Sequence, residues 1–234
     1  MRLISACLFI LIFFLSSCAV NRDIPDASDP SKFILDAGIN QRAVLKLKQA
    51  SIIHNDTGII WKTMGTGFLI SNNGCFLITY HQYTKVMREK GQISVPLYGK
   101  VALLGILSEH DLTLLKIEEK EETPFLPIAS HPYRVRPQEH MLLMPAFRPH
   151  RVFLADDPTE GPVLVKNTVT GGSKIFWVYR LVGDVRPGDS GSPLINQHGE
   201  AIGIAIASGG GGVSAIPISR EFLRQNLPNF SQCE

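Results

Sequence analysis

The sequence MGTGFLIS-NNG-CFLITY, which spans residues 64–80, places two apolar runs on either side of an Asn-Asn-Gly turn. An Asn-Gly pair between apolar runs is a strong hairpin signal, because both residues accept the positive φ angles that tight turns between adjacent strands require. The segment therefore predicts two antiparallel strands, over residues 64–71 and 75–80, joined through Asn73 and Gly74.

The rest of the chain repeats this arrangement. Short runs rich in Val, Ile, Leu, Phe and Tyr alternate with Gly, Pro or Asn from Ala43 to Ser219, and a second hairpin turn is expected at Gly199. Only residues 219–227, SREFLRQNL, carry a helical pattern. Many short strands without long helices indicate an all-β barrel or sandwich with one short C-terminal helix.

The composition excludes several classes of protein. The 234 residues are 44% hydrophobic and 19% charged, which is too apolar and too weakly charged for a disordered chain. The formal net charge is only +2, so the chain lacks the basic excess that neutralises phosphates, and we expect no nucleic-acid partner. Four cysteines in a chain of this length do not form a disulfide scaffold.

The N-terminus predicts a secretory signal. Arg2 is the only charged residue before Arg22, and residues 6–15 form a continuous apolar run. This run is too short for a membrane-spanning helix, which needs about 20 apolar residues. It fits the apolar core of a signal peptide that covers residues 1–17.

Residues 15–18, Leu-Ser-Ser-Cys, resemble the bacterial lipobox. The resemblance implies that Cys18 becomes a lipidated N-terminus and anchors the chain to a membrane of the bacterial cell envelope. Ala19 then favours the outer membrane or the periplasmic face over the inner membrane. The alternative is an ordinary signal peptide in which Cys18 is incidental. Prolines, aspartates and serines make residues 18–42 a flexible tether.

The most informative chemical motif is Gly188-Asp189-Ser190-Gly191. The glycines allow a tight turn that other residues cannot adopt. In such a turn the backbone N–H groups of Gly188 and Ser190 can converge on one point and stabilise an oxyanion, while the hydroxyl of Ser190 serves as a nucleophile. A glycine-rich turn without chemistry is the alternative interpretation.

A serine nucleophile needs a general base, and the base needs an acid that orients it. His81 directly follows an apolar run, and Asp111 directly precedes another. The candidates therefore occur in the chain order His81, Asp111, Ser190. His110 is a rival base, but it lacks the strand-end position of His81.

Five segments together resemble the chymotrypsin-like (trypsin-like) serine peptidases, and most closely their HtrA-type and glutamyl-endopeptidase-type bacterial branches. The segments are residues 65–70 (GTGFLI), 74–81 (GCFLITYH), 111–117 (DLTLLKI), 188–194 (GDSGSPL) and 211–218 (GGVSAIPI). The resemblance covers roughly residues 43–225 and implies two packed six-stranded β-barrels with the site in the cleft between them. By this analogy the peptidase domain spans 43–230 and the barrels separate near 120–135.

The resemblance also implies residue roles and an activity. His81 would act as general base and then acid, Asp111 as its partner, and Ser190 as the acylating nucleophile, with Gly188 and Ser190 forming the oxyanion hole. The chain would be a serine endopeptidase that cleaves protein or peptide substrates of the envelope. No histidine pair has helical metal-ligand spacing, so we expect no metal and no cofactor.

One departure from the family pattern keeps other functions open. Tyr80 stands before His81, where these peptidases carry a smaller residue, and it could block the cleft; Gln82 follows His81 in place of the usual Val or Cys. A catalytically inactive binding module at the membrane is therefore the main alternative, and an esterase with the same three residues is a weaker one.

The resemblance suggests a substrate pocket. Asp184 lies six residues before Ser190, where trypsin-like enzymes place the acid that binds substrate Arg or Lys, although a plain surface turn is the alternative. Ala205, Ile206 and Ala207 would line this pocket. The glutamyl branch carries a histidine where this chain has Ala205, which argues against glutamate specificity, and a preference for small residues stays open.

The folded part retains Cys75 and Cys233. In an oxidising compartment they could form a disulfide between the C-terminal tail and the first barrel, and two separate thiols are the alternative. HtrA relatives often carry a PDZ domain after the peptidase. Only about 15 residues follow Ile218, so we expect none here.

Overall fold

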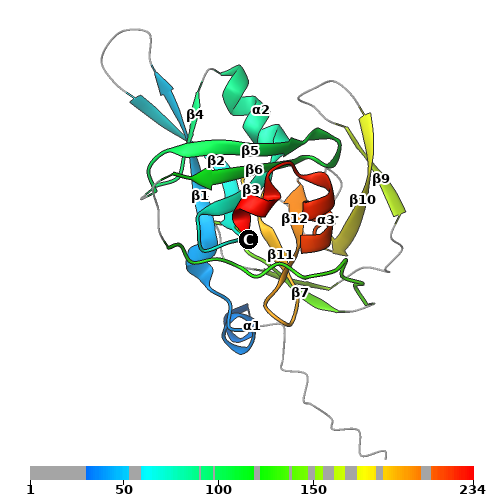
Figure 1. Cartoon of the computed structure of the whole chain (residues 1–234). Coiled ribbons are helices and arrows are strands. Elements are labelled where there is room, and N and C mark those ends of the chain that lie inside the picture. The colour runs from blue at the N-terminus through cyan, green and yellow to red at the C-terminus, as the bar shows by residue number, and fades with distance from the viewer. Residues whose placement is uncertain are drawn as a thin grey trace, which may run out of the picture.

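The computed structural model describes residues 30–52, 59–89, 91–96, 98–118, 122–136, 139–146, 151–154, 161–166, 173–182, 187–206 and 212–234. Within these ranges, two antiparallel β-sheets lie side by side and short helices flank them (Figure 1). The expected signal peptide, the expected lipid attachment at Cys18 and the first part of the expected tether lie outside the described residues.

The first sheet has six strands in the order β4-β1-β2-β3-β6-β5. Its strands are β1 (Val44–Ile52), β2 (Ile59–Leu69), β3 (Cys75–Thr79), β4 (Gln92–Ser94), β5 (Val101–Leu107) and β6 (Leu112–Ile117). The hairpin expected around residues 72–74 is confirmed, since β2 and β3 pair with Phe68 opposite Leu77. All five residues of β3 are buried, which explains why residues 75–78 form a continuous apolar run rather than an alternating one.

The second sheet has seven strands in the order β8-β7-β11-β12-β13-β10-β9, one more than the six expected. Its strands are β7 (His140–Leu143), β8 (Arg151–Leu154), β9 (Gly161–Lys166), β10 (Ser173–Val182), β11 (Pro193–Ile195), β12 (Ala201–Ile206) and β13 (Gly212–Pro217). The turn expected at Gly199 joins β11 to β12, and Gly199 has a φ of 76°. The expected all-β fold of two curled sheets is confirmed.

A shared apolar core joins the two sheets. Phe68 and Leu77 of the first sheet belong to the same buried cluster as Leu142 and Ile204 of the second. The chain crosses between them in the connection from β6 to β7. There, Leu126 donates its N–H to Leu69 in the first sheet at 2.9 Å, and Pro127 accepts from Ala201 in the second at 2.7 Å. The domain bounds expected from the sequence stay predictions.

The helices agree only partly with the sequence prediction. The C-terminal helix α3 (Arg220–Asn226) is confirmed, and Ser219 caps it by accepting the Phe222 N–H at 3.1 Å. Two α-helices were not expected, α1 (Pro30–Asp36) and α2 (Tyr80–Arg88). Short 3-10 helices are η1 (Gln41–Ala43), η2 (Ser108–His110) and η3 (Phe230–Cys233).

Helix α1 lies within residues 18–42, the segment expected to be the tether. The sequence prediction treats residues up to 42 as flexible, but Ile34 and Ile39 pack into the shared core, and Ile39 donates its N–H to the Ile34 carbonyl at 3.0 Å. Burying two isoleucines offsets the entropy of ordering this segment. Packing against the core therefore includes residues that precede 43.

The question left open for the two cysteines has a structural answer, because Cys75 and Cys233 form a disulfide. The bond joins the start of β3 to η3, and Asn73 adds a hydrogen bond from Nδ2 to the Gln232 carbonyl at 2.8 Å. The C-terminus consequently lies against the first sheet (Figure 1). No helix in the described part of the chain is long and apolar enough to cross a membrane.

Candidate active site

Strand register brings His81 and Asp111 together. Strands β3 and β6 pair antiparallel with Thr79 opposite Leu112, so the residues just after β3 meet the residue just before β6. Helix α2 begins directly after Thr79, and the Thr79 N–H donates to Gln82 Oε1 at 2.9 Å, as in a capping box. His81 therefore lies in the first helical turn, beside Asp111.

Asp111 accepts two hydrogen bonds from His81. Its Oδ2 lies 2.7 Å from His81 Nδ1, and its Oδ1 accepts the His81 backbone N–H at 2.7 Å. The Asp111 backbone has a φ of 50°, a left-handed conformation that aspartate tolerates better than most residues. Because the carboxylate is buried and engages Nδ1, it fixes the orientation of the imidazole and leaves Nε2 for other partners.

The Nε2 atom of His81 faces Thr79 Oγ1 at 3.3 Å. Among the described residues, no hydrogen bond joins Nε2 to the hydroxyl of Ser190. Tyr80, which raised the question of a blocked cleft, is half-buried, and its backbone N–H donates to the Asp111 carbonyl at 2.9 Å.

Ser190 lies in the turn between β10 and β11. Gly188 and Gly191 have φ angles of 100° and 84°, which glycine adopts without strain. The Gly191 N–H donates to Ala205 of β12 at 2.8 Å, and the Ser192 N–H donates to the Asp189 carbonyl at 3.0 Å. Within the described residues, the N–H groups of Gly188 and Ser190 donate to no backbone carbonyl, so they remain available to an oxyanion.

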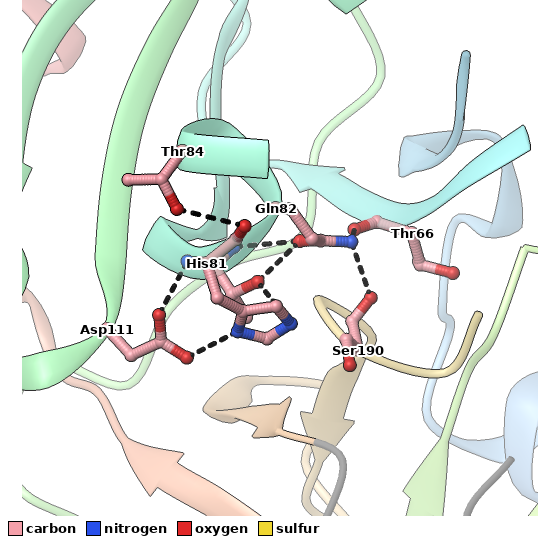
Figure 2. A network of polar contacts seen from close by, with 7 residues as sticks. Thr66, His81, Gln82, Thr84, Asp111 and Ser190 are labelled. Carbon is pink, nitrogen blue, oxygen red and sulfur yellow. Dashed lines mark hydrogen bonds and ion pairs between the residues drawn. The ribbon is translucent and has the colours of Figure 1, made fainter. Parts of the chain in front are cut away.

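Two buried polar residues, Thr66 of β2 and Gln82 of α2, hold this turn (Figure 2). Thr66 donates its hydroxyl to the Gly188 carbonyl at 3.1 Å and its N–H to the Ser190 carbonyl at 3.2 Å. Gln82 donates from Nε2 to the same Ser190 carbonyl at 2.9 Å and to the Thr66 carbonyl at 3.2 Å. The arrangement brings a histidine–carboxylate pair and a serine turn with two available N–H groups into one site, which suits acyl transfer.

The other sequence-predicted residues have mixed outcomes. Ala205 and Ile206 are fully buried in β12 behind the Ser190 turn, whereas Asp184 and Ala207 lie outside the described residues, so the substrate preference stays a prediction. The rival base His110 packs edge-on against Phe222, with ring centroids 5.1 Å apart. In the described part of the chain, no group of three or more His, Cys, Asp or Glu side chains could hold a metal ion.

Sequence reasoning missed Thr66 and Gln82 as parts of the site. The sequence analysis included Thr66 only as one residue of the 65–70 motif. For Gln82 a usable signal existed, because Thr79-Tyr80-His81-Gln82 matches the Thr-x-x-Gln capping pattern that predicts a helix start.

Comparison with known families agrees with this geometry. Residues 65–204 match the model of the trypsin-like peptidase domain. The chain belongs to this family. The expectation of a chymotrypsin-like serine peptidase domain is confirmed at the level of the family.

Two kinds of curated relatives are similar to this chain. It is 27% identical to serine protease HTRA1 of Xenopus tropicalis over 69% of this chain and 36% of the relative. It is 28% identical to a probable periplasmic serine endoprotease, DegP-like, of Chlamydia trachomatis over 65% of this chain and 30% of the relative. The chain thus spans about a third of the length of these relatives.

A solved structure has the same fold. The MamO protease domain from Magnetospirillum magneticum superposes with a TM-score of 0.58 and 20% sequence identity, covering 81% of this chain and 97% of that one. At this identity the likeness establishes the fold alone.

Proposed function

We propose that this chain is a serine endopeptidase that works through an acyl-enzyme. The observation that carries the proposal is the buried Asp111 carboxylate, 2.7 Å from His81 Nδ1, beside the Ser190 turn. In the proposed reaction Ser190 Oγ bonds to the carbonyl carbon of the scissile peptide, and its proton passes to His81 Nε2. His81 then protonates the departing amine as the C–N bond breaks, and a water molecule releases the acyl group by the reverse sequence.

The backbone N–H groups of Gly188 and Ser190 would stabilise the oxyanion of each tetrahedral intermediate. Their turn is held by hydrogen bonds from both sheets, so little reorganisation is needed as charge develops. Fixed donors of this kind contribute most when they are oriented before the reaction begins.

One observation favours a second candidate, an inactive binding module. His81 Nε2 faces the Thr79 hydroxyl at 3.3 Å instead of Ser190. If this contact persisted with substrate bound, Nε2 could not take the proton of Ser190.

A fluorophosphonate probe separates the two candidates, because it phosphonylates only an activated serine. We expect the purified full chain to be labelled and Ser190→Ala to remain unlabelled. Ser192→Ala is the matched control, since Ser192 lies two residues away with a buried hydroxyl that has no hydrogen-bond partner among the described residues, and it should be labelled normally. An unlabelled wild type, or equal labelling of Ser190→Ala, would contradict the peptidase proposal.

The proposed location of the protein is the bacterial cell envelope, with Cys18 lipidated. The Leu-Ser-Ser-Cys sequence supports the anchor, and the periplasmic name of the chlamydial relative supports the compartment. Bacteria that express the full chain should incorporate radiolabelled palmitate into it, and Cys18→Ser should abolish the incorporation. Persistent labelling of that variant would refute the anchor.

A further inference from the structure

Gln82 is a buried glutamine whose amide makes four hydrogen bonds. Its Oε1 accepts the N–H of Thr79 at 2.9 Å and the hydroxyl of Thr79 at 2.8 Å. Its Nε2 donates to the carbonyls of Thr66 and Ser190 at 3.2 and 2.9 Å. A primary amide offers two donors and two acceptor lone pairs, so every polar position of this side chain is used.

The four partners also fix the orientation of the amide. If the group were flipped, Oε1 would face two carbonyl oxygens, and the NH₂ group would face the Thr79 N–H. The space around the Gln82 amide is tightly filled. A Cβ at Gly65 would lie 2.2 Å from Gln82 Nε2, and one at Gly191 would lie 2.8 Å from Gln82 Oε1. The two glycines therefore leave room for a glutamine side chain in one pose.

The Gln82 amide affects the geometry of Ser190 because it helps to fix one of the two peptide planes that flank this residue. In a planar trans peptide the N–H points opposite to the C=O. Gln82 and Thr66 fix the Ser190 carbonyl, and Ser192 fixes the Asp189 carbonyl with an N–H donated at 3.0 Å. Ser190 stands between these two planes, so they set the direction of its side chain and of its own N–H.

The same side chain belongs to the helix that carries His81 (Figure 2). Gln82 and His81 are neighbours on the first turn of α2, which belongs with the first sheet, whereas Ser190 belongs to the second. A single side chain thus connects the backbone of the histidine to the backbone of the serine across the two sheets.

We propose that Gln82 is a positioning residue that keeps His81 and Ser190 in register for proton transfer. Within the described residues, no hydrogen bond joins its amide to the His81 ring or to the Ser190 hydroxyl, so it acts through the Ser190 carbonyl. The inference rests on the proposed peptidase function and adds a residue outside the His81, Asp111 and Ser190 set. A purely structural role would predict that removing the amide lowers stability but leaves the reactivity of the folded protein unchanged.

The chain offers a matched control in Gln49. This glutamine of β1 is also buried, and its Nε2 donates to Glu89 Oε2 at 2.8 Å. Glu89 caps the opposite end of α2, so Gln49 anchors the same helix far from Ser190. Methionine has nearly the shape of glutamine without its hydrogen-bonding groups. Gln82→Met and Gln49→Met therefore each remove one buried amide.

The test measures the inactivation of the full chain over a range of fluorophosphonate concentrations, at a temperature where thermal denaturation shows each variant folded. For Gln82→Met we expect the maximal inactivation rate to fall about 10- to 100-fold, because small displacements of reacting groups have effects of this size. The half-saturating probe concentration should be unchanged. Gln49→Met should stay within about twofold of the wild type in both constants.

Equal rates for the two variants, or a change confined to the half-saturating concentration, would overturn the inference while leaving the peptidase function intact. An unreactive wild type would instead overturn the proposed function, and this inference with it. If Gln82→Met does not fold, Gln82→Asn replaces it, since its amide is one methylene too short to bridge Thr79 and Ser190. The same outcomes then apply.

Discussion

The two halves of the candidate site are built by different means. His81 and Asp111 are 30 residues apart, and two neighbouring strands of one sheet bring them together. Ser190 depends on the other sheet, since Gln82 and Thr66 hold its turn from positions 108 and 122 residues away from the groups they bind. The base half, His81 and Asp111, is thus a product of strand register within the first sheet. The nucleophile half, the Ser190 turn, also depends on contacts that cross from the first sheet and α2.

Because of this difference, mutations in the two halves should have different effects on folding and on chemistry. A change in the base half should alter chemistry with little effect on folding. A change in the nucleophile turn should affect folding and chemistry together, because the same contacts hold the turn and join the sheets. Each of the following predictions can contradict this expected difference between the two halves.

The largest effect is expected from Asp111→Asn. Asparagine tolerates the left-handed backbone at this position, so stability should change little. Its side chain can accept only one of the two His81 hydrogen bonds with an oxygen, and the fluorophosphonate inactivation rate should fall by about 10³- to 10⁴-fold.

The control for this variant is Glu109→Gln, which alters an exposed acid two residues away and should leave the rate unchanged. Retention of more than about a tenth of the rate in Asp111→Asn would show that the carboxylate does not orient His81.

Gly191→Ala should damage the nucleophile turn itself. A Cβ there would lie 1.9 Å from the Thr66 carbonyl oxygen, and the φ of 84° is strained for alanine. We expect a loss of roughly 2–5 kcal/mol in the free energy of unfolding, measured by urea denaturation.

Gly38→Ala is the matched control, because its φ is 63° but nothing lies within 4 Å of the added Cβ. It should cost only about 1–2 kcal/mol. Similar losses in both variants would mean that the contact between Thr66 and the turn is not tight.

The smallest effect is expected from Thr66→Val, which removes the hydroxyl without changing the shape of the side chain. The Gly188 carbonyl then loses a donor, and the Ala146 N–H, 3.0 Å from Thr66 Oγ1, loses an acceptor. Stability should fall by about 1–3 kcal/mol, and the inactivation rate of the folded protein by about tenfold.

Thr66→Ser keeps the hydroxyl and should retain most of the rate, although it loses a buried methyl group. If valine and serine behaved alike, the hydroxyl would have no role in holding the turn.

The sequence alone was enough for much of the fold. The hairpin at residues 64–80 was predictable because turn chemistry and apolar runs are local signals, and the helical pattern of residues 219–227 predicted α3. The roles of His81, Asp111 and Ser190 stay predictions, but the structure does bring His81 and Asp111 into contact.

The failures of sequence reasoning share a physical cause. Helix α1 depends on the packing of Ile34 and Ile39 against distant strands, which no local pattern reveals. The contacts of Gln82 and Thr66 likewise depend on how the two sheets meet. Buried hydrogen bonds between elements far apart in sequence cannot be inferred before those elements have been placed.

The disulfide gives the molecule the topology of a closed ring. Cys75 and Cys233 are 158 positions apart, and His81, Asp111 and Ser190 all lie between them. A single backbone cut at any exposed connection inside this ring leaves one covalent molecule that still contains all three residues. Such a nicked form would run as separate fragments on an electrophoresis gel only after reduction, so an apparently intact band does not exclude cleavage, including cleavage of one copy by another.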